Sequence, residues 1–140
     1  AKENFKIPVF STIINRIQAI PIDRKNREAA FNSIKKAENV LKQKIHIGIL
    51  PEGTRTTDGE MNVFKKGGFH MAINTKTPII PVGVIGAYNF KPKQRWWIKP
   101  GSIIINIGKP TNVESYESLG VDGLSNSVEK SIKNLIKDTT

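Results

Sequence analysis

The chain has 140 residues, enough for one domain with a sizeable core. Its 22 Lys and Arg residues outnumber 12 Asp and Glu residues, and a formal net charge of +10 favours anionic partners such as phosphorylated substrates, anionic membranes or nucleic acid. The absence of cysteine excludes disulfides and cysteine-ligated zinc, and no apolar run approaches the roughly 18 residues that a transmembrane helix needs.

The N-terminal third of the chain predicts two helices. Apolar residues recur at helical spacing from Phe10 to Ile17, and this segment either lies on a bilayer or, as we favour, packs on the sheet. Residues 20–22 form a short extended piece before Arg24. The range 26–43 predicts a second helix, with one apolar stripe made of Ala30, Ile34, Ala37 and Leu41.

The middle of the chain alternates strands and helices. Residues 45–50 predict a buried strand, followed by a polar loop over 54–60 with an Asp-Gly turn signal. A helix is expected from about residue 67 until Thr77-Pro78 breaks it. Residues 79–85 then predict another buried strand, in which Pro81 favours an edge position or a bulge.

The last third adds a loop, a strand and a helix. Residues 91–100 predict a loop or hairpin, and 103–107 a third strand. The final helix is expected from about Ser125, with a Glu129–Lys133 pair on its outer side and an inner side made of Leu124, Val128, Ile132 and Leu135. The alternation of helices and strands predicts an α/β fold with a mixed sheet and flanking helices.

The stretch 50–55, which reads L-P-E-G-T-R, carries the strongest functional signal. It follows a predicted strand, and open α/β sheets place ligand sites in the loops at strand ends. Arg55 suits a phosphate because its planar guanidinium can donate two hydrogen bonds at once. Further basic residues in or beside predicted loops are Arg24, Lys65 and Lys66. Each alone reads as a surface charge, but the glycine-rich setting favours anion binding by Arg55 and Lys65.

Three other side chains have roles that the sequence leaves open. Glu52 can serve as a general base, accept hydrogen bonds from substrate hydroxyls, or hold the loop as a structural partner of Arg55. His46 falls in the predicted apolar strand and is expected to be a core histidine rather than a base. His70, in the first turn of a predicted helix, fits either role, and neither histidine has a carboxylate near it in the sequence.

The two tryptophans, Trp96 and Trp97, stand among basic residues. They predict either a membrane-interface patch or a loop whose aromatic side chains cover the sheet. The basic neighbours are Lys93, Arg95 and Lys99. Neither a serine nucleophile elbow nor a Walker phosphate loop is present in the sequence.

Residues 50–55 resemble the F-P-E-G-T-R block of the glycerolipid acyltransferases, the 1-acylglycerol-3-phosphate (lysophosphatidate) acyltransferase family. Residues 20–24 look like the second block of that family, which ends in an arginine. Residues 64–69 (F-K-K-G-G-F) look like the F-K-x-G segment after the third block, and residues 77–82 (T-P-I-I-P-V) like the fourth. The similarity covers about residues 1–110, so the resemblance implies part of the glycerolipid-acyltransferase fold.

The resemblance implies that six residues bind the glycerol phosphate of the acceptor: Arg24, Glu52, Gly53, Thr54, Arg55 and Lys65. Residues 79–82 would help to shape the acyl or acceptor pocket. In this family an H-x4-D block does the chemistry: the histidine takes the proton from the acceptor hydroxyl, the aspartate orients the histidine, and the hydroxyl oxygen attacks the acyl thioester. Here the fifth residue after His46 is Pro51. The fifth after His70 is Thr75, so no catalytic residue and no metal ligand is assigned.

In the family the H-x4-D block lies upstream of the segments that this chain resembles. We therefore expect residues 1–140 to be a single acyltransferase domain fragment without the N-terminal catalytic block, and to lack transferase activity alone. The whole enzyme would move a fatty acyl group from acyl-CoA or acyl carrier protein to the free hydroxyl of 1-acylglycerol-3-phosphate. The product would be phosphatidic acid, for phospholipid biosynthesis, and no cofactor is implied.

The expected location is the cytoplasmic face of a membrane, reached peripherally or through an anchor in the upstream part. An anionic membrane surface would suit the positive charge of the chain. The alternatives are a catalytically inactive phospholipid-binding module and a nucleic-acid-binding module. Nucleic acid is not an expected partner, because the sequence has no RNP, KH, zinc-finger or helix-turn-helix signature.

Overall fold

The structure, a computed structural model of the chain, describes residues 11–12, 16–17, 19–20 and 26–137. The chain divides into two compact units, Ala1–Ile47 and Gly48–Thr140. The predicted helix over residues 10–17 lies mostly outside the described residues. Arg24 and most of its predicted extended segment also lie outside them.

The described part of the first unit is mainly α2 (Arg27–Lys42), which confirms the helix predicted over 26–43. Asn26 caps its start, since the side chain of Asn26 accepts a hydrogen bond from the backbone N–H of Ala29 at 3.0 Å. Glu28 in the first turn and Lys42 in the last turn both complement the helix dipole. The local sequence is therefore sufficient to define this helix.

Residues 45–50 do not form the buried strand that their apolar composition predicts. They have no strand pairing within the described part of the chain, and Leu50 is 88% exposed. His46 is also exposed, so its assignment as a core histidine was wrong. The physical reason is that an apolar run specifies neither a hydrogen-bonding partner nor a covering layer, and a buried strand needs both.

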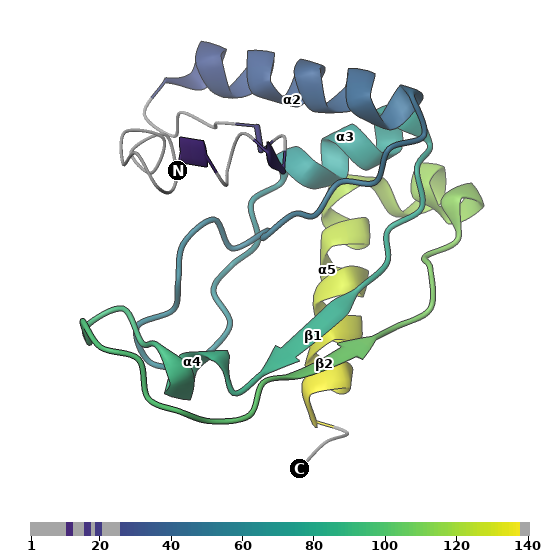
Figure 1. Cartoon of the computed structure of the whole chain (residues 1–140). Helices are drawn as coiled ribbons and strands as arrows, with labels where there is room; N and C mark the ends of the chain where they lie inside the picture. Colours follow the sequence, from purple (N-terminus) through teal and green to yellow (C-terminus); the bar gives the residue numbers. More distant parts are fainter. Residues whose placement is uncertain (1–10, 13–15, 18, 21–25, 138–140) are drawn as a thin grey trace. The chain divides into compact units, whose positions relative to one another are not determined.

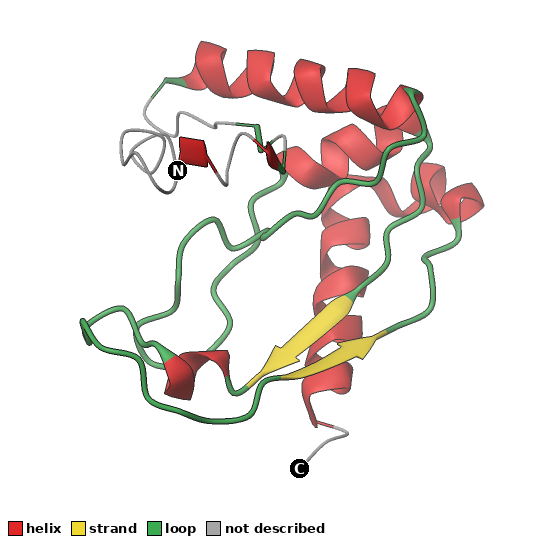
Figure 2. Ribbon diagram, viewed as in Figure 1, coloured by secondary structure: helices red, strands yellow, loops and turns green. Residues whose placement is uncertain are grey.

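The second unit contains a small sheet, the long helix α5 and three short helices (Figure 2). Its elements in chain order are α3 (Gly67–Thr75), β1 (Val82–Ile85), α4 (Ala87–Phe90), β2 (Ile104–Ile107), the 3-10 helix η2 (Val113–Ser115) and α5 (Tyr116–Lys137). The α/β class with flanking helices is thus confirmed. The strands predicted over 79–85 and 103–107 form, each in shortened form.

Strands β1 and β2 pair antiparallel, with Val84 opposite Ile105. The pairing continues beyond the strands, because the N–H of Gly108 donates to the carbonyl of Pro81 at 2.9 Å. Pro81 precedes the first residue of β1, in agreement with the edge position predicted from its missing N–H. Helix α5 packs against both strands (Figure 1).

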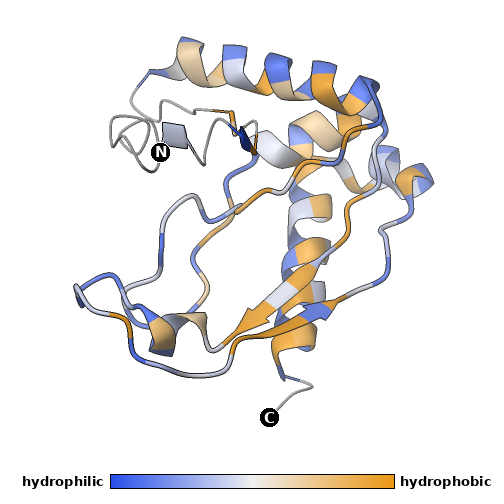
Figure 3. Ribbon diagram, in the orientation of Figure 1, coloured by the Kyte–Doolittle hydropathy of each residue, from blue (hydrophilic) through white to orange (hydrophobic). Residues whose placement is uncertain are grey.

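The two faces of this sheet differ in what covers them. On the covered face, Gly83 lets α5 approach closely, because a Cβ atom at this position would lie 3.0 Å from the Cβ of Leu135. Asn106, opposite Gly83, donates from its amide to the Leu135 carbonyl at 2.7 Å. The other face carries apolar side chains. In Figure 3 both strands are coloured mainly as hydrophobic. The side chains of this face, all 40–71% exposed, are Ile80, Val82, Val84, Ile103, Ile105 and Ile107.

The hydrophobic core lies between α3, the start of α5 and the segment before α3. Its buried members are Phe64, Phe69, Ala72, Tyr116, Leu124 and Val128. The rings of Phe64 and Phe69 stack with centroids 6.2 Å apart, which fixes the segment before α3 to the helix itself. This packing determines where residues 64–69 lie, and these residues belong to the functional site.

Helix α5 begins at Tyr116, nine residues before the predicted start at Ser125. Gly120 breaks it with a left-handed backbone (φ 58°, ψ −174°), so it consists of a first turn, a kink and a long second part. The first turn of α5 is not predicted from the sequence, because glycine at positions 120 and 123 disfavours a helix there. The predicted outer pair is confirmed, with Lys133 and Glu129 joined at 2.7 Å.

Candidate functional site

The L-P-E-G-T-R stretch begins with a tight turn. The N–H of Gly53 donates to the carbonyl of Leu50 at 3.1 Å, and Gly53 has a positive φ of 71°. Proline is favoured at the second position of such turns because its ring presets φ, and glycine at the fourth. The local sequence therefore specifies this reversal, in which Glu52 is the third residue and which Arg55 follows two residues later.

Glu52 is held by Asn62, ten residues further along the chain. Its Oε2 atom accepts two hydrogen bonds, from the backbone N–H and from the side-chain amide of Asn62, each at 2.9 Å. Both residues are half-buried. The structural role considered from the sequence, a pairing of Glu52 with Arg55, does not occur in the described part of the chain. The observed arrangement uses the carboxylate to close the loop between residues 52 and 62.

Lys65 lies beside the same turn. Its backbone N–H donates to the carbonyl of Pro51 at 2.8 Å, so the F-K-K-G-G-F segment returns to the L-P-E-G-T-R stretch. The next residue, Lys66, is the N-cap of α3, but no side chain caps the free N–H groups of this helix. The side chain of Lys66 pairs with Asp122 at 2.6 Å. The two adjacent lysines therefore differ: the side chain of Lys66 is paired, whereas that of Lys65 is exposed and has no partner among the described residues.

Thr54 and Arg55 are the exposed end of the turn. Within the described ranges, neither side chain has a hydrogen-bond or ion-pair partner. An unpaired guanidinium keeps all its donors for an outside anion. The free N–H groups at the start of α3 carry a partial positive charge of the same sign, which favours an anion nearby.

The polar loop after Arg55 is ordered by its own side chains. The hydroxyl of Thr56 donates to the carboxylate of Asp58 at 2.7 Å, and the N–H of Glu60 donates to it at 3.0 Å. These bonds, that from Thr56 above all, lower the pKa of Asp58 below its ordinary value. Tyr88 and Gln94 both donate to the carbonyl of Thr57, at 3.0 and 2.9 Å. The loop is therefore tied to the segment that follows β1.

The fourth block, residues 77–82, is anchored by Tyr116. Its hydroxyl donates to the carbonyl of Thr77 at 3.0 Å and accepts from the N–H of Ile79 at 3.1 Å. Only 2% of Tyr116 is exposed, and this burial raises the pKa of its phenol above the ordinary value, whereas the bond from Ile79 opposes the rise. The block is thus fixed to the start of α5.

The structure brings five of the six predicted site residues to one loop region: Glu52, Gly53, Thr54, Arg55 and Lys65. Arg24 lies outside the described residues. Asn62 and Tyr116 are the supporting residues that sequence reasoning missed. No local pattern identifies either, because each acts through a contact ten or more residues away.

The other chemical groups do not gather around this site. His70 is exposed on α3, and His46 is exposed before the turn. Within the described part of the chain, no group of three or more His, Cys, Asp or Glu side chains is placed to hold a metal ion. No helix in that part is long and apolar enough to cross a membrane.

Fold and site together define an α/β protein whose arginine-bearing turn is hydrogen-bonded to a basic, glycine-rich helix start. The chain belongs to the acyltransferase family, whose sequence pattern matches residues 1–85.

Its relatives are 1-acyl-sn-glycerol-3-phosphate acyltransferases. The chain is 32% identical over 120 residues to the alpha enzyme of Mus musculus, covering 84% of this chain and 42% of that protein. It is 32% identical over 133 residues to the enzyme of Borreliella burgdorferi, covering 95% of this chain and 50% of that protein. The chain therefore spans about half the length of the curated relatives it matches.

A solved structure has the same fold. The crystal structure of the 1-acyl-sn-glycerophosphate (LPA) acyltransferase PlsC from Thermotoga maritima superposes with a TM-score of 0.84 at 28% sequence identity. The match covers 99% of this chain and 54% of that one. The α/β class inferred from the sequence and the family resemblance are both confirmed by these comparisons.

Proposed function

We propose that this chain supplies the acceptor-binding part of a lysophosphatidate acyltransferase. The observation that carries the proposal is the hydrogen bond from the N–H of Lys65 to the carbonyl of Pro51. This bond holds the backbone of Lys65, whose side chain is exposed, against the turn that precedes Arg55, which supports a second cation near the guanidinium. The printed names of the relatives, 1-acyl-sn-glycerol-3-phosphate acyltransferases, support a phosphorylated glycerol acceptor.

In the proposed complex, the phosphate of the acceptor is bound by Arg55 and Lys65. Arg55 donates two parallel hydrogen bonds, Lys65 adds a point charge, and the uncapped start of α3 adds its dipole. Gly53 gives the turn its positive φ, and Thr54 offers a hydroxyl donor. Arg24 is proposed as a further phosphate ligand by family resemblance alone.

Glu52 acts in this proposal as a positioning residue. One of its oxygens already accepts two hydrogen bonds from Asn62, so its negative charge is used to hold the loop. The carboxylate also balances part of the positive charge around the phosphate. We do not assign it the role of general base, which requires access to the acceptor hydroxyl.

The proton transfer itself is assigned to groups outside these residues, since the sequence contains no H-x4-D block. We propose that acyl-CoA or acyl carrier protein donates the acyl group and that the whole enzyme produces phosphatidic acid at the cytoplasmic face of a membrane. The chain alone is proposed to be inactive. Thioester-dependent acylation of lysophosphatidate by the 140 residues would contradict this part of the proposal.

The test of the acceptor site is a calorimetric titration of the chain with glycerol 3-phosphate. The expected result is saturable binding that Arg55→Ala and Lys65→Ala each weaken by about tenfold or more, as for loss of a charged hydrogen bond. The matched control is Lys130→Ala, an exposed lysine on α5. Equal weakening by all three variants would indicate a general charge effect and contradict a defined phosphate site.

A further inference from the structure

One long segment of the chain is entirely free of acidic residues. From Met61 to Val113 there is no Asp or Glu, whereas the same stretch contains eight Lys and Arg residues. Four of these eight fall within ten residues, 91–100, and the two tryptophans of the chain stand among them. We call residues 91–100 the tryptophan loop. Residues 61–113 thus carry a net charge of +8, and half of this charge lies in the tryptophan loop with the largest aromatic side chains.

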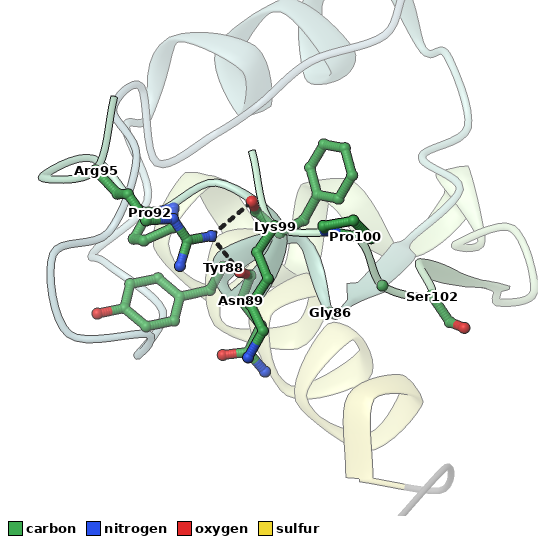
Figure 4. Close-up of a pocket in the computed structure, with 10 residues that line it drawn as sticks. Gly86, Tyr88, Asn89, Pro92, Arg95, Lys99, Pro100 and Ser102 are labelled. Carbon is green, nitrogen blue, oxygen red and sulfur yellow. Dashed lines mark hydrogen bonds between the residues drawn. The ribbon is translucent and has the colours of Figure 1, made fainter. Parts of the chain in front are cut away.

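The tryptophan loop is held in place by hydrogen bonds within it and to α4. The guanidinium of Arg95 donates to the carbonyls of Asn89, Phe90 and Trp97, at 2.7, 2.8 and 3.1 Å. The side chain of Lys91 donates to the carbonyl of Arg95. Figure 4 shows the bonds from Arg95 that reach toward α4, beside a pocket of about 400 Å³. Two of the four basic residues therefore build the loop.

This scaffold presents apolar side chains to solvent instead of burying them. Trp96 is 86% exposed, Trp97 53% and Ile98 58%. The two indole rings contact each other edge to face with centroids 5.8 Å apart, and Arg95 lies over the ring of Trp97. Of the two alternatives for these tryptophans, the loop that covers the sheet is therefore wrong. An exposed apolar group of this size on an ordered loop indicates a contact surface.

We propose that the tryptophan loop is a membrane-contact surface for anionic lipid. Tryptophan favours the bilayer interface, where its ring meets the acyl boundary and its N–H meets the polar layer. The two basic residues that do not build the loop, Lys93 and Lys99, are exposed and flank the aromatic pair. Anionic headgroups attract such lysines, and the tryptophan loop itself contains no acidic residue. Its acidic neighbour is Asp58, which follows the Thr57 carbonyl that Gln94 binds.

A lipid surface fits these observations better than the other anionic partners do. A nucleic acid would stack bases on the faces of the aromatic rings, and Arg95 already lies over the ring of Trp97. An acidic protein would bind the basic side chains, but such a partner would not account for the exposure of Trp96 and Ile98. A lipid interface uses both properties. The inference is independent of acceptor binding, since it concerns different residues.

The chain offers a specific probe of this proposal. Trp96 and Trp97 are its only tryptophans, so intrinsic tryptophan emission reports on this loop alone. The 140-residue chain is titrated with vesicles of phosphatidylcholine containing phosphatidylglycerol, and separately with pure phosphatidylcholine vesicles and a single-stranded oligonucleotide. We expect a blue shift, and quenching by brominated acyl chains, with the anionic vesicles. No shift with these vesicles would overturn the proposal, and an equal response to the oligonucleotide would replace it with nucleic-acid binding.

Substitutions then test which side chains are responsible. In vesicle co-sedimentation, Lys93→Gln with Lys99→Gln should weaken binding by about 30-fold, given about fivefold for each basic residue at an anionic surface. Trp96→Ser with Trp97→Ser should weaken it by more than about 50-fold. The control pair Lys36→Gln with Lys130→Gln removes the same charge from exposed positions on α2 and α5. Equal loss in the control, or no loss in the tryptophan pair, would contradict a localised contact surface.

Because all substituted side chains are exposed, circular dichroism should show an unchanged fold in each variant. A failed glycerol 3-phosphate titration with successful vesicle binding would refute the proposed acceptor site alone. The reverse result would refute the membrane-contact surface alone.

Discussion

The bond between Glu52 and Asn62 makes a quantitative prediction about the loop that carries Arg55. Asn62→Ala removes the amide donor and keeps the backbone N–H donor, so it deletes one of two hydrogen bonds to the same carboxylate. Hydrogen bonds to charged groups contribute about 1.5–3 kcal/mol. Both residues are only half-buried, so we expect a contribution at or just below the bottom of that range, about 1 to 1.5 kcal/mol of loop stability.

The assay is a double-mutant cycle with Glu52→Ala, Asn62→Ala and the double variant. Urea unfolding gives the global free energy, and amide hydrogen exchange at Asn62 and Lys65 gives the free energy of local opening. We expect a coupling energy of about 1 kcal/mol, because the second substitution removes a bond that the first has already broken. The backbone amide of residue 62 should lose more protection from exchange in Glu52→Ala than in Asn62→Ala.

Two results would contradict this role of the bond between Glu52 and Asn62. Additive effects, with coupling below about 0.3 kcal/mol in both measurements, would show that the bond does not brace the loop. A different failure would be a Glu52→Ala variant of unchanged stability and exchange that no longer binds glycerol 3-phosphate. In that case Glu52 would contact the acceptor directly.

Three further predictions follow from individual contacts. Tyr116→Phe should lower the free energy of unfolding by about 1–2 kcal/mol through loss of two hydrogen bonds. Because folding raises the pKa of this phenol, its contribution to stability should be intact below about pH 10 and lost as pH rises through the folded-state pKa. Urea unfolding of the parent chain should show this loss, and the variant should not. Lys66→Ala should cost at most about 0.5 kcal/mol of stability, because the paired side chains of Lys66 and Asp122 are 60% and 75% exposed. Calorimetry should show an unchanged affinity for glycerol 3-phosphate, in contrast to Lys65→Ala. An equal loss of affinity in both variants would show that the two lysines have the same role. Gly83→Val should cost about 1–3 kcal/mol in urea unfolding through its clash with Leu135, and a neutral result would contradict the close packing of α5 on the sheet.

Much of the local structure could be predicted from the sequence because local patterns specify it. Periodicity and the Asn26 cap define α2, and the Pro-Glu-Gly order defines the turn. The i, i+4 spacing of Glu129 and Lys133 defines their pair. In each case the interacting groups lie within four residues or within one helical repeat.

The parts that sequence reasoning missed depend on distant partners or on covering layers. Asn62 is ten residues from Glu52, and no spacing rule joins them. The apolar run 45–50 was mistaken for a buried strand because composition alone does not supply a pairing partner. The first turn of α5 was missed because Gly120 reads as the end of a helix rather than a kink within one. The choice between the two alternatives for Trp96 and Trp97 depended on how exposed their side chains are, which composition does not determine.

In the proposed site, an acceptor phosphate binds between residues 50–55 and the start of α3. The most direct test is nuclear magnetic resonance of the labelled chain during a glycerol 3-phosphate titration. We predict saturable shifts of the Arg55 side-chain N–H and of the backbone amides of Lys65, Gly67 and Gly68. Shifts confined to other basic residues, with these four signals unchanged at saturating ligand, would contradict a phosphate site at this position.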